Sequence, residues 1–205
     1  MTLADKVTST SLVLAPVFFI IYFLPVIFST VFSLPLPNSP LVGTAWTVPI
    51  LWFLFVLSEV TDMLDGMIAR KQGEVSDFGK LYDPFADTLT QITYFLCFVV
   101  DGILPPVFFL VVLYREFSIL FVRNLMLKKG ITMGARIGGK IKTVSYILAG
   151  GLALLASSVI RLGLGTEFFR WIVLASRVVF IFSVIIAILS FIDYLVVFAK
   201  SPEGK

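Results

Sequence analysis

The sequence predicts an all-α integral membrane protein with six transmembrane helices and with both termini in the cytoplasm. Of its 205 residues, 59% are hydrophobic and 14% are charged, against about 45–50% apolar and about 25% charged residues in an average soluble domain. Six apolar stretches approach the roughly 20 residues that a helix needs to cross a bilayer. The length favours a single transmembrane domain over residues 1–205.

The six stretches follow one another with short connections. They cover residues 11–34, 45–60, 85–100, 106–127, 143–160 and 171–199. The first contains Pro16 and Pro25, is long enough to span, and has no clear small-residue cleavage site, so we expect it to be retained. The second continues into an aspartate-rich segment, so its helix is expected to project beyond the hydrocarbon. A charge-free, proline-rich loop at 35–40 joins these two stretches.

Basic residues concentrate on one side of the predicted membrane. They are Arg70, Lys71, Lys80, Lys128, Lys129, Arg136, Lys140, Lys142, Lys200 and Lys205. The positive-inside rule places this side in the cytoplasm, and an even number of spans then puts both termini there. We expect an integral protein of a bacterial inner membrane with its active site facing the cytoplasm. The net charge of +3 is too small to indicate nucleic acid as a partner.

Two residue types are scarce, and their scarcity limits the chemistry. The sequence has no histidine and one cysteine, Cys97. An intrachain disulfide and a thiolate metal site are therefore excluded, and so are the commonest general base and the commonest transition-metal ligand. Any metal is expected to be bound by oxygen, which favours Mg²⁺, Mn²⁺ or Ca²⁺.

Two blocks, at 62–70 and 79–87, hold four aspartates beside two apolar segments, while Asp77 lies in the loop between them and is expected to be solvated. On helices, the four aspartates and several small residues form one stripe on each of two consecutive helices. The stripes are Asp62, Asp65, Gly66 and Ala69, followed by Gly79, Asp83 and Asp87. If these helices pack antiparallel, the four carboxylates surround one cavity and require a cation or a proton among them.

The oxygen-only ligand set suits one or two Mg²⁺ or Mn²⁺ ions, which could hold a diphosphate. The small residues leave room for a nucleotide, and Arg70 could donate to a phosphate. The chemistry alone therefore indicates metal-assisted attack on a diphosphate-linked substrate at the membrane surface. A solvated helix end is the ordinary alternative for one such pair, but carboxylates in phase on two helices favour a site.

These residues resemble a known family. The pattern Asp-x₂-Asp-Gly-x₂-Ala-Arg-x₈-Gly-x₃-Asp-x₃-Asp is the signature of the CDP-alcohol phosphotransferases, and the sequence matches every fixed position. The resemblance implies attack of an alcohol on the β-phosphorus of a CDP-linked lipid or CDP-alcohol, with release of CMP, by a homodimer among membrane lipids. It implies metal ligands at Asp62, Asp65, Asp83 and Asp87, with Asp87 also the catalytic base. It implies a CDP-binding surface of Asp62, Gly66, Ala69, Arg70 and Gly79.

The fourth stretch and the loop after it carry cations that concern the acceptor. Arg115, Arg123, Lys140 and Lys142 could line a pocket for an anionic acceptor. Alternatively, Arg115 could simply pair with Glu116 or snorkel, and the basic loop could anchor the chain at anionic headgroups.

Segments 83–87 and 139–143, together with Arg115-Glu116, resemble the phosphatidylglycerophosphate synthases, which transfer a phosphatidyl group from CDP-diacylglycerol to glycerol 3-phosphate. Thr88 and Ser11 depart from that branch, which usually has Lys and Arg there. They keep open the transfer of phosphocholine or phosphoethanolamine from a CDP-alcohol to diacylglycerol.

An ion transporter is a more remote alternative, since intramembrane carboxylates also mark ion paths. A prenyltransferase would be expected to be longer, with two distant aspartate motifs.

Overall fold

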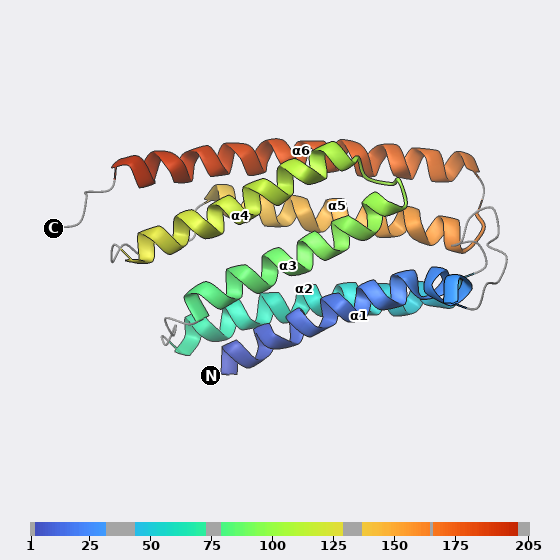
Figure 1. Cartoon of the computed structure of the whole chain (residues 1–205), viewed down its shortest axis with the longest axis horizontal. Helices are drawn as coiled ribbons and strands as arrows, with labels where there is room; N and C mark the ends of the chain where they lie inside the picture. Colours follow the sequence, from blue (N-terminus) through green and yellow to red (C-terminus); the bar gives the residue numbers. More distant parts are fainter. Residues whose placement is uncertain (1–2, 32–43, 73–78, 129–136, 165, 201–205) are drawn as a thin grey trace.

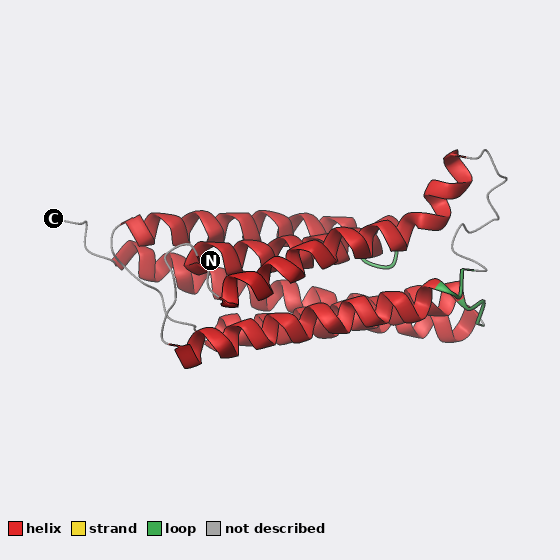
Figure 2. Ribbon diagram, turned by 90° about the horizontal axis from the view of Figure 1, so that it is seen from below, coloured by secondary structure: helices red, strands yellow, loops and turns green. Residues whose placement is uncertain are grey.

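The structure, a computed structural model, describes residues 3–31, 44–72, 79–128, 137–164 and 166–200. Within these ranges it leaves out the side chains of residues 3–7, 29–30, 65–72, 80, 137 and 166. All regular elements in the described ranges are helices (Figure 2). They are α1 (Leu3–Val31), α2 (Thr47–Gln72), α3 (Gly79–Val100), α4 (Pro106–Lys128), α5 (Ile137–Arg161) and α6 (Thr166–Lys200).

The predicted number of six helices is confirmed. By length and composition, four of these helices qualify as membrane spans among the described residues, against the six spans that were predicted. The four are Thr8–Phe28, Thr47–Leu64, Gly138–Arg161 and Glu167–Lys200. The other two helices, α3 and α4, have 22 and 23 residues and are long enough at about 1.5 Å per residue. Their sequences, however, include Asp83, Asp87, Arg115, Glu116 and Arg123. Many large apolar side chains are exposed on the outside of the bundle, as a lipid-facing surface requires.

The helices run side by side along one long axis (Figure 1). The start of α1 and the end of α6 lie at the same end of the bundle, together with the end of α2 and the start of α3. As predicted, α2 continues as one helix through the first aspartate block, and α3 begins at Gly79. Both aspartate blocks therefore lie at this end, which we call the aspartate end.

The sequence is compatible with direct antiparallel packing of α2 and α3, whereas in the structure α1 packs against both. Helix α1 packs closely against both of them, and α2 and α3 are not among the closely packed pairs of the described helices. Small polar residues allow this arrangement. Ser11 and Thr61 share a hydrogen bond of 2.8 Å between α1 and α2, and Thr8 Oγ1 donates to Asp83 Oδ1 of α3 at 3.0 Å.

Aromatic side chains fill the core between the helices. The Phe18 ring of α1 lies 4.5 Å from that of Tyr94, and the Phe95 ring lies 4.9 Å from that of Phe180, measured between centroids. Gly150 of α5 faces Phe55 closely, since a Cβ atom there would meet that ring at 3.3 Å. These contacts between different helices fix the scaffold that carries the aspartate end.

A buried polar cluster holds the opposite end of the bundle together. Arg161, expected in a connecting loop, is instead the last residue of α5 and is 1% exposed. Its guanidinium donates to Thr47 Oγ1 at 2.8 Å and to the Tyr22 carbonyl at 3.0 Å. The Tyr22 hydroxyl donates to Asp101, and it lies 2.9 Å from Ser157 Oγ, which can donate to it in turn. Burial raises the pKa of Asp101, while the Tyr22 hydrogen bond and the Arg161 charge oppose that rise.

Candidate active site

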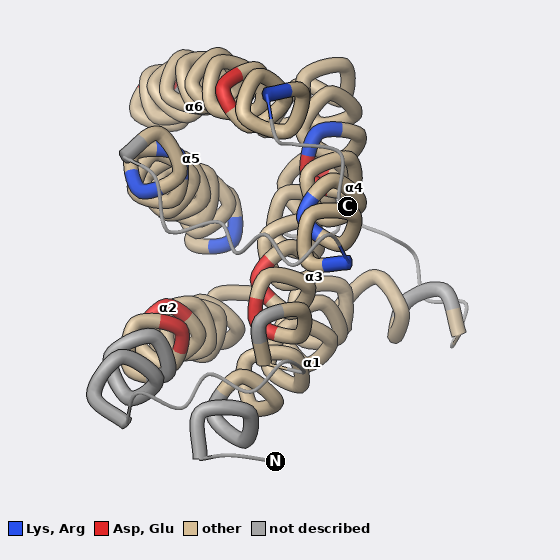
Figure 3. Tube along the Cα trace, turned by 90° about the vertical axis from the view of Figure 1, so that its left-hand side faces the viewer, with Lys and Arg blue, Asp and Glu red and all other residues tan. Residues whose placement is uncertain are grey.

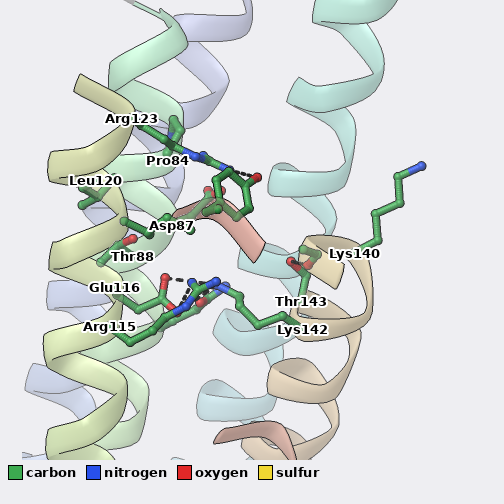
Figure 4. A pocket seen from close by; sticks show the side chains of 14 residues that line it. Pro84, Asp87, Thr88, Arg115, Glu116, Leu120, Arg123, Lys140, Lys142 and Thr143 are labelled. Carbon is green, nitrogen blue, oxygen red and sulfur yellow. Dashed lines mark hydrogen bonds and ion pairs between the residues drawn. The ribbon is translucent and has the colours of Figure 1, made fainter. Parts of the chain in front are cut away.

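A cavity of about 220 Å³ lies towards the aspartate end, between α3, α4, α5 and α6 (Figure 4). Each of these helices contributes polar side chains to it. Those lining residues are Asp87, Thr88 and Gln91 of α3, Arg115, Glu116 and Arg123 of α4, Lys140, Lys142 and Thr143 of α5, and Tyr194 of α6. The cavity therefore joins the last predicted aspartate to all four cations of the predicted acceptor pocket.

The predicted aspartates lie on α2 and α3, and one of them reaches this cavity. Asp62, Asp83 and Asp87 are partly buried, and Asp87 lines the cavity. Gly79 is buried at the start of α3. The remaining predicted site residues of α2, namely Asp65, Gly66, Ala69 and Arg70, lie within the helix but outside the described side chains.

The donor chemistry of the aspartate end fits a hard divalent metal ion. Asp83 and Asp87 lie one helical turn apart on α3, and Thr8 donates a hydrogen bond to Asp83, as outer-shell groups do to ligating carboxylates. With no histidine in the chain, oxygen ligands favour Mg²⁺ or Mn²⁺. Among the described side chains no group of three potential ligands forms a metal centre, and Asp65 lies outside that set.

Arg115 and Glu116 pair with each other, as one alternative predicted, and they also line the cavity. Arg115 Nη1 lies 2.8 Å from Glu116 Oε1, and Lys142 Nζ lies 3.1 Å from both carboxylate oxygens of Glu116. The Tyr146 hydroxyl donates to the same carboxylate at 3.1 Å. Arg115 also donates through Nε to the Ala187 carbonyl at 3.1 Å. This group therefore ties α4, α5 and α6 together at the cavity wall.

The other two predicted cations occupy different positions. Arg123 Nη2 donates to the Tyr194 hydroxyl at 3.0 Å, and its guanidinium lies 5.4 Å from the centre of that ring. Lys140 is exposed and points away from the cluster of Arg115, Glu116 and Lys142 (Figure 4). Arg123 is thus held at the cavity, while Lys140 lies at its rim.

Charges of opposite sign face one another at this end. Viewed from the aspartate end, acidic positions lie on α2 and α3, and basic positions lie across from them on α4 and α5 (Figure 3). Lys142 interacts electrostatically with Asp87 across the cavity. The arrangement can hold an anion on the basic side, next to a carboxylate able to accept a proton.

Several residues in or beside the cavity have no distinctive signal in the sequence. Tyr194 and Tyr146 are buried tyrosines in apolar helices, and their hydroxyls contact charged groups at the cavity. A buried tyrosine hydroxyl requires a polar partner, which is the one signal that could have marked them. Thr88 is buried in the cavity wall, where the sequence comparison indicated only a missing cation.

Comparisons with known proteins give one family match and several similar relatives. The model of the family described as CDP-alcohol phosphatidyltransferase matches residues 1–189. A CDP-diacylglycerol–glycerol-3-phosphate 3-phosphatidyltransferase of Treponema pallidum is 38% identical over 199 residues, which cover 97% of this chain and 89% of the relative. The enzyme of the same name from Bacillus subtilis is 32% identical over 155 residues, covering 75% of this chain and 76% of the relative.

Proposed function

Because this chain belongs to the CDP-alcohol phosphatidyltransferase family, we propose that it transfers a phosphatidyl group from CDP-diacylglycerol to glycerol 3-phosphate. The acceptor hydroxyl oxygen bonds to the β-phosphorus, the bond from that phosphorus to the bridging oxygen breaks, and CMP leaves. The product is phosphatidylglycerophosphate. Family membership sets aside the ion transporter and prenyltransferase alternatives.

The observation that supports this acceptor is the set of three cations at the cavity beside Asp87. Arg115, Arg123 and Lys142 all line it, and a phosphomonoester provides the negative charge that such cations bind. Glu116 pairs with Arg115 and Lys142, but one carboxylate does not balance three cations, and a neutral acceptor such as diacylglycerol would add no negative charge beside them. The cavity therefore keeps cations although Thr88 and Ser11 stand where that branch usually has Lys and Arg.

We assign roles to the site residues on the same basis. Asp87, at the cavity wall, would accept the proton of the attacking hydroxyl, since the chain has no histidine for this task. The nucleotide would lie over Asp62, Gly66, Ala69 and Gly79, with Arg70 donating to its diphosphate.

The metal site would consist of the four carboxylates. Asp62, Asp65, Asp83 and Asp87 would hold one or two Mg²⁺ or Mn²⁺ ions. When bound, the metal neutralises charge on the diphosphate. Thr8 would keep the Asp83 carboxylate oriented through the hydrogen bond of 3.0 Å.

We further propose that all six helices cross the membrane, that the aspartate end faces the cytoplasm, and that the protein forms homodimers. The shared location of the start of α1, the end of α6 and the aspartate blocks supports the first two proposals (Figure 1). A cysteine introduced at exposed Lys140 should react with reagents on the cytoplasmic side. The native Cys97 is buried, so it should not contribute to the labelling. Labelling from the opposite side would contradict this topology, and a monomeric mass in detergent would contradict the dimer.

The acceptor is tested by CMP release from purified protein with Mg²⁺. We expect CMP from CDP-diacylglycerol with glycerol 3-phosphate and none from CDP-choline with diacylglycerol. The converse result would replace the acceptor. No CMP from either pair would contradict the proposed reaction. Chelation of the metal is expected to stop release and added Mg²⁺ to restore it.

Replacing Arg115 with alanine is expected to raise the KM for glycerol 3-phosphate about 10- to 100-fold, the range for losing a charged hydrogen bond of about 1.5–3 kcal/mol. The KM for CDP-diacylglycerol should stay near its original value. Steady-state kinetics with each substrate varied in turn measures both. Arg170→Ala is the matched control, since that arginine is exposed at the opposite end of the bundle. An unchanged KM for the acceptor would remove Arg115 from the acceptor site.

A further inference from the structure

We propose that Glu116 is a positioning residue that fixes Arg115 and Lys142 where they can bind the phosphate of the acceptor, an inference that rests on the proposed function. Glu116 is 2% exposed and lies in the cavity wall. A negative charge in an anion-binding pocket weakens anion binding if it acts through charge alone. Its presence beside two cations therefore calls for another explanation.

The contacts of Glu116 supply that explanation. Its Oε1 atom accepts from Arg115 Nη1 at 2.8 Å, from Lys142 Nζ at 3.1 Å and from the Tyr146 hydroxyl at 3.1 Å. Its Oε2 atom accepts from Lys142 Nζ, also at 3.1 Å. Two cations from different helices, α4 and α5, are thus joined through one carboxylate (Figure 4).

The other contacts of the two cations restrict them further. Arg115 also donates to the Ala187 carbonyl and, at 3.5 Å, to Ser190 Oγ of α6. Lys142 Nζ lies 4.6 Å from the centre of the Tyr146 ring. A guanidinium has five N–H donors and an ammonium has three. The hydrogen bonds above use three of the five donors of Arg115 and two of the three donors of Lys142. Each cation therefore keeps donors for a phosphate.

Electrostatics explains why these two cations need a shared carboxylate. Two buried cations this close repel each other, and without a counter-charge one of them would move away or lose its proton. Glu116 offsets that repulsion and lets both side chains remain at the same wall of the cavity. The pocket then presents two neighbouring donors at a fixed spacing, which suits the several oxygens of one phosphate.

Three explanations of Glu116 predict different kinetics for Glu116→Gln, which removes the charge but keeps the shape. If Glu116 positions the cations, the KM for glycerol 3-phosphate rises about 10- to 100-fold although the pocket has become more positive. If it only neutralises charge, this KM falls. If it only stabilises the fold, the thermal midpoint falls while both KM values stay unchanged.

The experiment measures kcat, both KM values and the thermal midpoint for wild type, Glu116→Gln and the control Glu167→Gln. Glu167 is an exposed glutamate of α6, paired only weakly with Arg170 at 3.3 Å, and its replacement should change none of these values. A rise in the acceptor KM with an unchanged KM for CDP-diacylglycerol supports the proposal. A fall in the acceptor KM, or no change, overturns it.

A second variant keeps the proposal testable if Glu116→Gln does not fold. Tyr146→Phe removes one hydrogen bond to Glu116 and retains the aromatic ring, so it is expected to raise the acceptor KM by about 3- to 10-fold. An unchanged acceptor KM in this variant would also count against the proposal. Failure of wild type to use glycerol 3-phosphate would instead reject the proposed function, which the wild-type reaction tests separately.

Discussion

Replacing Asp87 with asparagine is expected to lower kcat for CMP release by about 100- to 10,000-fold, the usual contribution of a general base. Asp87 lines the same cavity as Arg115 and Lys142. Asparagine keeps the size of the side chain but cannot accept the proton of the acceptor hydroxyl. The affinity for the CDP nucleotide, measured by binding of CDP to the purified protein, should be retained.

A titration with Mg²⁺ separates the base role of Asp87 from a role as metal ligand alone. If the variant only binds metal more weakly, high Mg²⁺ restores kcat, whereas a missing base is not restored at any concentration. Recovery of kcat would therefore refute the base assignment, as would loss of CDP binding. Asp193→Asn serves as a matched control, because Asp193 is exposed on α6 and is not among the residues that line the cavity.

The sequence predicted the features of the site that depend on one helix at a time. Helical periodicity places Asp83 and Asp87 on one face without any knowledge of the neighbours. The continuation of α2 through the first aspartate block to Gln72 was predictable for the same reason. Charges within an apolar stretch also stand out in a sequence, so Arg115 and Arg123 were recognised as candidates.

Features that depend on lateral packing could not be read from the sequence. Helices α1 and α6 are apolar around most of their circumference, so no polar face shows which neighbours they contact. The position of α1 against both α2 and α3, and the contact of Tyr194 with Arg123, follow from that packing. Lys140 and Lys142 are equally basic in the sequence, yet only Lys142 reaches Glu116.

The buried cluster at the opposite end gives the second large expected effect, on stability. Arg161→Ala is expected to lower the free energy of unfolding by about 3–5 kcal/mol, as for removal of one partner from a buried charged network. The variant loses the hydrogen bonds to Thr47 Oγ1 and to the Tyr22 carbonyl. It also loses the cation–π contact in which the guanidinium lies 4.4 Å from the centre of the Tyr22 ring. Unfolding of the purified protein in detergent measures the change.

Distance and exposure provide the controls for Arg161. Nearly the whole of α5 separates Arg161 from Lys142, about 28 Å at the helical rise per residue, so the folded variant should keep the KM of wild type for both substrates at a low temperature. Arg170→Ala removes an arginine whose side chain is 76% exposed, and it should change the stability by less than about 0.5 kcal/mol. Equal stability of the two variants would show that the buried cluster does not hold this end of the bundle together. A lower stability of Arg161→Ala with unchanged KM values would separate the residues that maintain the scaffold from those that bind the substrates.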